Sequence, residues 1–296
     1  MRTGGLVILP TETVYGLAAD AADPLAVARI FEAKGRPRFN PLIAHVASLD
    51  EAKRFADLDA RALRLAEAFW PGPLTLVAPI RDRESVCDLA RAGLDSVAIR
   101  VPVHPVALGL LRAFGGPIVA PSANRSGRPS PTTFADALAE TGVSAAAALD
   151  GGPCAIGLES SVVALMDGLP RLLRPGAVTR DQIESLIGPL ARDEADGHRS
   201  PGRLTRHYAP AAPVRLNAVY PEPGEAYMAF GPWPSGPGVF NLSPGADLAE
   251  AAAQLFACLR AADATAPLGI AVAPIPDAGL GEAINDRLRR AAGFVG

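Results

Sequence analysis

The sequence has few cysteines and no long apolar run. Cys87, Cys154 and Cys258 are its only cysteines, they lie far apart, and none forms a CxxC pair. This pattern supports neither a disulfide framework nor a zinc knuckle, and it is typical of a reducing compartment. No apolar run approaches the roughly 18 residues of a membrane-spanning helix, and the first residues lack the features of a secretory signal. We therefore expect a cytoplasmic protein with no membrane partner.

The sequence also lacks bulk positive charge. Its formal net charge of −3 argues against a protein that coats nucleic acid by bulk charge. The same net charge is compatible with a local basic cleft. Hydrophobic residues make up 49% and charged residues 20% of the 296 residues, so the chain can form a packed core. Of its 28 basic residues only Lys34 and Lys53 are lysine, and this scarcity draws attention to Lys34.

Several common catalytic motifs are missing. The chain has no GxxxxGK[ST] phosphate loop, no GxSxG elbow, no HExxH helix, and no GxGxxG after a predicted strand. Its four histidines are too scattered to predict a metal site. The remaining signal is a set of cationic, hydroxyl-rich loops. Such loops favour chemistry that positions anions and stabilises a charged transition state over covalent catalysis.

Short apolar runs alternate with helix-like stretches, which predicts a layered α/β fold. The predicted strands are residues 6–9, 42–46, 74–80, 97–101, 118–120, 145–149, 162–166, 172–174, 214–218, 227–230, 239–242 and 268–273. The predicted helices are residues 24–34, 48–55, 59–70, 105–114, 133–141, 179–187, 246–262 and 281–292.

The pattern divides the chain into two domains. Residues 1–188 form the first, and residues 213–296 form a smaller α/β domain. Residues 189–212 between them are rich in charge, proline and glycine and show little periodicity, so we interpret them as a linker.

Three loop segments carry the polar residues that could form a site. Pro10–Leu17 follows the first predicted strand. In Lys34–Pro41 the cations continue past the end of a predicted helix, where they are too far from its last turn to compensate the helix dipole and could instead bind an anion. Ala120–Ser130 opens a buried strand into a loop of small hydroxyls, asparagine and arginine, which suits an anion. The alternatives are a polar turn that caps a helix, a dipole-compensating helix end and a solvated loop. Arg100, at the end of a strand, is unremarkable alone.

These segments, in this order, resemble the threonylcarbamoyl-AMP synthase family, the YrdC-like proteins. The residues that carry the resemblance are PTETVYGL (10–17), AKGRP with NPL and His45 (33–45), WPGPLT (70–75), the strand ending at Arg100 with VPxHP, PSAN (121–124), GLESS (157–161) and LLRPG (172–176). The connector SPGRLTRHYAP (200–210) resembles that of the family's long, two-domain form. The resemblance implies a twisted open mixed sheet with a concave ligand cleft and a small Rossmann-like second domain.

The resemblance also implies an activity. L-threonine, bicarbonate and ATP would give threonylcarbamoyl-AMP and pyrophosphate, with Mg²⁺ accompanying the ATP. The product would pass to the tRNA threonylcarbamoyl transferase machinery for the t6A modification at tRNA position 37. Because both reactants are anionic, several fixed cations are needed to offset their repulsion.

The resemblance assigns the site residues by their positions in the motifs. The catalytic set is Lys34, Arg36, Ser122 and Asn124. The L-threonine set is Thr13, His45, Arg100, Ala120 and Ser160. The ATP set is Arg36, Asn40, Ser96, Ser122, Ser130, Arg174 and Tyr208.

Tyr208 comes from the linker, which holds Arg203, Arg206 and His207 close by. A plain spacer needs no such cluster, so we expect the linker to form a lid over the nucleotide. The alternative is that these residues only dock the two domains.

Two other functions remain open at this stage. The first is a double-stranded RNA or tRNA-binding module without catalysis, which would show a steep salt dependence and little need for ATP. The second is a transferase acting on carbamoyl phosphate, but such proteins carry acylphosphatase-like and zinc-finger segments that the sequence lacks.

Overall fold

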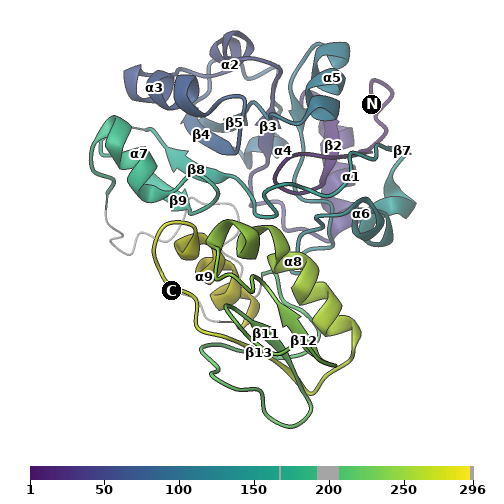
Figure 1. Cartoon of the computed structure of the whole chain (residues 1–296). Helices are drawn as coiled ribbons and strands as arrows, with labels where there is room; N and C mark the ends of the chain where they lie inside the picture. The colour runs from purple at the N-terminus through teal and green to yellow at the C-terminus, as the bar shows by residue number, and fades with distance from the viewer. Residues whose placement is uncertain (167, 192–206, 294–296) are drawn as a thin grey trace.

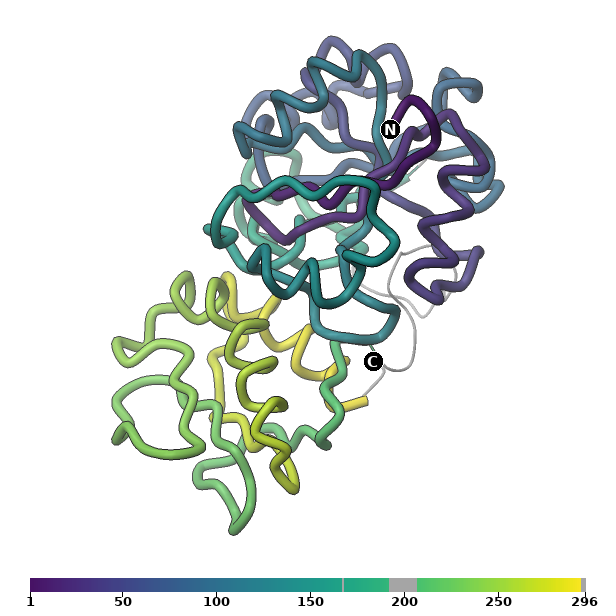
Figure 2. Tube along the Cα trace, turned by 90° about the vertical axis from the view of Figure 1, so that its right-hand side faces the viewer, coloured from purple at the N-terminus to yellow at the C-terminus, as the bar shows by residue number. Residues whose placement is uncertain are grey.

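Two sheets organise the computed structural model, which describes residues 1–166, 168–191 and 207–293. Figure 1 shows the two sheets and their helices as an upper and a lower unit, and Figure 2 shows the same arrangement after a quarter turn. The upper unit contains the N-terminus and the lower unit the green and yellow C-terminal part of the chain.

The first unit is built on a mixed, open sheet with the strand order β7-β1-β2-β6-β3-β5-β4-β8-β9. Its strands are β1 (Val7–Leu9), β2 (Gly16–Asp20), β3 (Ile43–His45), β4 (Leu74–Pro79), β5 (Ser96–Arg100), β6 (Ile118–Val119), β7 (Ala147–Ala148), β8 (Ser161–Ala164) and β9 (Arg171–Arg174). β3 runs parallel to β5 but antiparallel to β6, and β4 runs antiparallel to β5. The predicted mixed α/β sheet is confirmed.

Helices cover this sheet. They are α1 (Pro24–Lys34), α2 (Leu49–Phe55), α3 (Ala60–Phe69), α4 (Asp88–Arg91), α5 (Pro105–Phe114), α6 (Phe134–Thr141) and α7 (Arg180–Ile187), with a short 3₁₀ turn at Gly142–Ser144. Within the described residues, no helix has both the length and the apolar character that crossing a membrane requires.

The helix α1 shows how local sequence sets these bounds. The Asp23 carboxylate accepts hydrogen bonds from the Leu25 and Ala26 amides, and Pro24 occupies the first turn. Gly35 ends the helix in the left-handed region at φ 58°, which suits a residue without Cβ. The cationic segment that begins at Lys34 therefore leaves the helix at a fixed point.

The second unit has a parallel four-stranded sheet with the order β10-β13-β11-β12. Its strands are β10 (Val214–Arg215), β11 (Glu225–Ala229), β12 (Val239–Asn241) and β13 (Gly269–Val272). The helices α8 (Leu248–Ala264) and α9 (Leu280–Ala291) share one buried core with this sheet.

The two units are in close contact. Val14 and Leu158 of the first unit are buried in the core cluster of the second. Gly157 lies so close to α8 that a Cβ there would be 2.5 Å from the Ala253 carbonyl oxygen. The second unit therefore packs directly on loops that the sequence places in the candidate site.

The sequence did not predict β2 and α4. GLAAD has no β-branched residue, and β2 is a strand because β1 and β6 flank it on both sides. The polar run Pro10–Leu17 therefore leads into a strand, and the alternative of a turn that caps a helix is wrong. The four-residue α4 is too short to show a helical period.

Candidate functional site

Arg100 forms a buried polar corner at the end of β5. Its Nε donates to the Gly72 carbonyl oxygen at 3.1 Å and its Nη1 donates to Thr13 Oγ1 at 2.9 Å. Its Nη2 is 2.5 Å from a carboxylate oxygen of Glu12. The structure thus brings together Arg100 and Thr13, two residues of the predicted L-threonine set, and it adds Glu12, which the sequence analysis had not paired with any residue.

His45 lies beside this corner. The parallel register of β3 and β5 pairs His45 with Arg100, and β6, which precedes Ala120, lies on the other side of β3. Burial, assisted by the Arg100 charge, lowers the pKa of His45 to about 3, so its imidazole is neutral at pH 7. Its Nδ1 is buried without a hydrogen-bond partner.

Lys34 holds the PSAN loop. Its ammonium, buried by the surrounding chain, donates to the backbone carbonyl oxygens of Ser122 and Asn124. Burial, followed by the Arg36 charge, lowers the pKa of Lys34 well below its usual value. The cation therefore shapes the backbone between Ser122 and Asn124 as well as adding charge.

Arg36 and Asn40 have fewer partners than Lys34. Arg36 Nη2 is 3.4 Å from the Pro41 carbonyl oxygen, and its Nε is buried without a partner. Burial lowers the pKa of Arg36 to about 10, and the nearby Arg174 adds to this shift. Asn40 is buried and its Oδ1 has no partner.

Glu159 is a buried carboxylate that contacts Ser130 of the first unit and Arg287 of the second. It accepts a hydrogen bond from Ser130 Oγ at 2.6 Å and forms an ion pair with Arg287 of α9 at 3.0 Å. Burial alone would raise the pKa of Glu159, but Arg287, Arg174 and Ser130 together hold it at about 2. Glu159 is therefore ionised, and sequence reasoning had seen it only as part of the GLESS motif.

Arg174 is the last residue of β9, and it contacts Ser160, the residue directly before β8. Arg174 Nε and Nη2 donate to the Ser160 carbonyl oxygen at 3.1 and 2.9 Å. Ser160 Oγ is 2.8 Å from Thr75 Oγ1, so Ser160 is fixed by two neighbouring strands.

Tyr208 lies where the second unit meets this cluster. Its ring centroid is 4.0 Å from that of His207 and 5.3 Å from that of Phe256, and the Arg287 guanidinium lies 5.5 Å from it. Burial, followed by the Glu159 charge, raises the pKa of Tyr208 to about 12. The linker residues Arg203 and Arg206 lie outside the described residues.

Ser96 lies at the opposite end of β5 from Arg100. It pairs with Pro79 at the first residue of β5, whereas Arg100 is the last. Ser96 and Arg100 are four residues apart on β5, so their side chains point to the same face of the strand. Because four residues of a strand span about 13 Å, Ser96 is too far away to belong to the polar group around Arg100.

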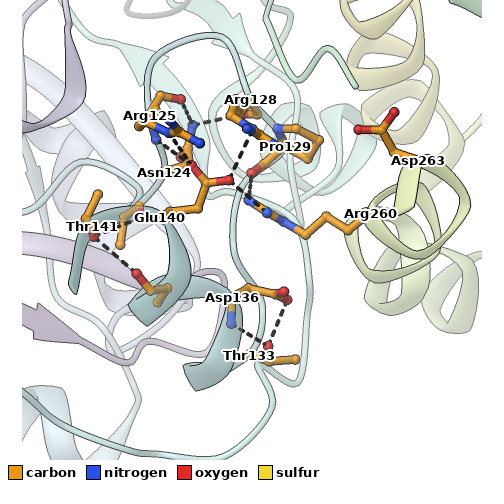
Figure 3. A network of polar contacts seen from close by, with 12 residues as sticks. Asn124, Arg125, Arg128, Pro129, Thr133, Asp136, Glu140, Thr141, Arg260 and Asp263 are labelled. Carbon is orange, nitrogen blue, oxygen red and sulfur yellow. Dashed lines mark hydrogen bonds and ion pairs between the residues drawn. The ribbon is translucent and has the colours of Figure 1, made fainter. Parts of the chain in front are cut away.

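The loop after the PSAN motif is held by charges from both units (Figure 3). Asn124 Nδ2 donates to the Arg125 and Arg128 carbonyl oxygens at 2.8 and 2.9 Å. The buried Glu140 of α6 pairs with Arg128 at 3.2 Å and with Arg260 of α8 at 3.0 Å. Arg260 could not be predicted as part of this network, because a helix pattern does not show which distant loop one of its side chains contacts.

Buried polar atoms without partners gather in the predicted site. Among the residues that the structure describes, they are Arg36 Nε, Asn40 Oδ1, His45 Nδ1, Asn124 Oδ1, His207 Nδ1, Arg260 Nε and Arg287 Nη2. Four of these belong to predicted site residues, and an unpaired buried polar atom costs about 1–3 kcal/mol. Arg36 Nε is a donor, whereas the Asn40 and Asn124 Oδ1 atoms are acceptors, so the set suits a ligand that carries both anionic oxygens and hydrogen-bond donors. In the same described ranges, no cluster of histidine, cysteine and acidic side chains could hold a metal ion.

Comparisons with known proteins cover both units. Residues 1–176 match the family described as "Telomere recombination", which covers Sua5, YciO and YrdC proteins. Residues 178–293 match the family described as "Threonylcarbamoyl-AMP synthase, C-terminal domain". The fold and the site thus define an α/β protein of the Sua5, YciO and YrdC class.

Full-length relatives narrow this class. Threonylcarbamoyl-AMP synthase of Bacillus subtilis is 40% identical, with 99% of this chain and 91% of the relative covered. The enzyme of the same name from Pyrococcus abyssi is 41% identical, with 99% and 92% covered. The solved structure of P. abyssi Sua5 complexed with L-threonine has a TM-score of 0.90 at 40% identity and covers 99% of this chain and 92% of that one. This chain belongs to the threonylcarbamoyl-AMP synthase family, in its two-domain form.

Proposed function

We propose that the protein condenses L-threonine, bicarbonate and ATP into threonylcarbamoyl-AMP and pyrophosphate, as a nucleotidyltransferase in tRNA t6A37 modification. The family membership supports the activity, and the unpaired buried polar atoms at Arg36, Asn40, His45 and Asn124 carry the assignment of its site. The Arg36 donor and the buried Lys34 and Arg100 suit two anionic reactants, and the two amide oxygens would accept from donor groups of the substrates.

The threonine end of the site is the Arg100 corner. Thr13 and His45 lie next to it, and we assign Ala120, whose amide bonds to the Ile43 carbonyl oxygen of β3, and Ser160, which bonds to Thr75 of β4, to the same end. A guanidinium that already hydrogen-bonds Thr13 and a neutral imidazole offer donors and acceptors for an amino acid. Arg100 would hold the carboxylate, in exchange with or beside Glu12.

The ATP end lies between α1, the PSAN loop and the second unit. Arg36 and Lys34 act on the phosphates together with Ser122 and Asn124. We assign the rest of the nucleotide to Ser130 and Arg174, which are held by Glu159 and Ser160, and to Asn40, Tyr208 and Ser96, the last at the far end of β5 from Arg100. Magnesium enters with ATP as part of that substrate, and bicarbonate is the co-substrate.

The same proposal extends to the whole chain. Residues 1–188 are the catalytic domain, residues 189–212 the linker and lid, and residues 213–296 the second domain, which we propose is Rossmann-like because its four strands are parallel. The protein is cytoplasmic and passes its product to the tRNA threonylcarbamoyl transferase machinery.

RNA binding without catalysis is not favoured, because Lys34 and Arg100 are buried rather than presented on the surface.

The test is product formation. Protein, ATP with magnesium, bicarbonate and labelled threonine should give a labelled threonylcarbamoyl-AMP and an equal amount of pyrophosphate. Omission of threonine or bicarbonate is the control and should abolish both. Pyrophosphate without a threonyl product from the wild-type protein, or no reaction at all, would contradict the proposed function.

A further inference from the structure

The helix α9 places an arginine of the second unit deep in the interface. Arg287 is only 1% exposed. Its Nε donates to a Glu159 oxygen at 3.0 Å, and its Nη1 donates to the Pro175 carbonyl oxygen at 2.8 Å. Asp286, next to it on α9, accepts a further hydrogen bond at 2.7 Å. The guanidinium is therefore held on both sides of the interface.

Three contacts of Arg287 lead to residues that we assign to ATP. Glu159 accepts the hydrogen bond of Ser130 at 2.6 Å. Pro175 directly follows Arg174, and the Tyr208 ring lies 5.5 Å from the Arg287 guanidinium. One side chain of the second unit thus contacts three separate segments around the nucleotide. Its Nη2 is also buried without a partner.

Charge explains why the site needs this residue. The buried Glu159 carboxylate interacts with both Arg287 and Arg174. The Arg174 guanidinium donates to the carbonyl oxygen of Ser160, the residue after Glu159, so without Arg287 it would be drawn more strongly to Glu159 and withdrawn from an anionic ligand. A buried carboxylate that loses one partner is strongly driven to find another.

We propose that Arg287 is a positioning residue for ATP, which neutralises Glu159 and so keeps Arg174 available to the nucleotide. This role rests on the proposed function. It makes a competent ATP site depend on an arginine from the second unit rather than on the first unit alone.

The experiment compares Arg287→Met with the double variant Glu159→Gln/Arg287→Met. Binding of ATP with magnesium is measured by calorimetry without threonine, and KM values for ATP and threonine follow from initial rates. Arg287→Met should weaken ATP binding by about tenfold or more, while KM for threonine stays within about twofold. The double variant should recover most of the ATP affinity, because no unpaired carboxylate remains to compete for Arg174.

A second ion pair of α9 supplies the matched control. Glu282 pairs with Arg180 across the same interface at 2.8 Å, and both side chains are about one-third exposed. Glu282→Gln should bind ATP like the wild type. If the interface acted only by holding the two units together, Arg287→Met and Glu282→Gln would weaken ATP binding to the same extent.

Two outcomes would overturn the proposal. One is unchanged ATP affinity in Arg287→Met, and the other is a double variant that binds ATP as weakly as the single one. If Arg287→Met does not fold, the double variant, which leaves no unpaired carboxylate, decides by the same ATP measurement. A wild-type protein that binds ATP but makes no threonylcarbamoyl-AMP would contradict the proposed function and leave this result standing.

Discussion

At the scale of single residues, Lys34 and Arg36 differ sharply although they are two positions apart. Lys34 donates to two backbone carbonyl oxygens, whereas Arg36 makes one long hydrogen bond of 3.4 Å and has an unpaired buried Nε. Arg36 therefore has more capacity for a phosphate, and Lys34 combines charge with support of the PSAN loop.

This difference predicts two distinct phenotypes. Arg36→Ala should lower threonylcarbamoyl-AMP formation about 10²-fold and leave the thermal melt close to that of the wild type. Lys34→Ala should lower both product formation and the melting temperature, because the Ser122 and Asn124 carbonyl oxygens each lose a charged donor worth about 1.5–3 kcal/mol. Initial rates and melting curves test this, with the exposed Lys53→Ala as control. An unchanged melt in Lys34→Ala, or full activity in Arg36→Ala, would contradict it.

Two buried histidines predict a pH dependence of stability. Burial, with smaller contributions from nearby charges, lowers the pKa of His45 and of His207 to about 3 from a usual 6.5. Between these values the unfolded chain binds protons that the folded chain does not. The free energy of unfolding should therefore fall by about 2 kcal/mol per histidine from pH 7 to pH 5.

Urea unfolding at pH 7 and pH 5 measures this loss. In His45→Asn the loss should shrink by about half, since one of the two histidines is gone. Glu159 does not interfere, because its pKa is lowered from 4.5 to about 2 and its stabilisation is lost only below about pH 4.5. Equal free energies of unfolding at the two pH values would show that neither histidine is neutral in the fold.

At the scale of elements, the loop from Asn124 to Ser130 is fixed by neighbours far away in the sequence. Glu140 of α6 accepts from the Arg125 amide at 3.0 Å, and the Ala209 amide donates to the Gly127 carbonyl oxygen at 2.7 Å. Arg260 of α8 pairs with Glu140 and donates to the Pro129 carbonyl oxygen (Figure 3). The loop's geometry thus depends on both units.

Removal of Arg260 should loosen this loop. We expect Arg260→Ala to raise KM for ATP several-fold and to destabilise the protein by about 1–2 kcal/mol, because Glu140 keeps Arg125 and Arg128 as partners. KM for threonine should change little. The exposed pair of Arg81 with Asp57 gives the control Arg81→Ala, which should alter neither value. A proportional rise of both KM values would point to general unfolding instead.

The sequence predicted elements where local signals were strong. The bounds of α1 and α5 follow from a cap, an early proline and a final glycine, and the structure confirms them. Strand β2 was missed because its pairing partners, not its residues, make it a strand. Likewise the site's loops were predicted, but the Glu12–Arg100 and Glu159–Arg287 pairs join residues 88 and 128 positions apart, which no local pattern records.

At the scale of the whole molecule, Tyr208 joins the two units. It has a positive φ of 62°, an unusual backbone conformation for a residue with a side chain, and its ring is buried in the core of the second unit. Its ring lies 5.5 Å from the Arg287 guanidinium, and the amide of the next residue, Ala209, donates to the Gly127 carbonyl oxygen of the first unit at 2.7 Å. Tyr208 is thus in place either to close the nucleotide site or only to dock the units.

If Tyr208 is part of a lid, its removal should uncouple pyrophosphate release from formation of the threonylcarbamoyl product. Tyr208→Ala should raise KM for ATP and release more pyrophosphate than threonylcarbamoyl product, because an open site lets water hydrolyse the adenylate. It should also lower the thermal melt, since truncation of a buried aromatic side chain costs about 3–5 kcal/mol. The ratio of pyrophosphate to product, measured with labelled ATP and labelled threonine, separates the two effects.

Phe256→Ala is the matched control, because Phe256 packs against Tyr208 from within the second unit. It should destabilise the protein to a similar degree and keep the ratio of pyrophosphate to product near one. Tyr208→Phe retains the ring and should keep both the melt and the ratio close to those of the wild type. If Tyr208→Ala also keeps a ratio near one, Tyr208 only docks the units, and water is excluded from the adenylate by other residues.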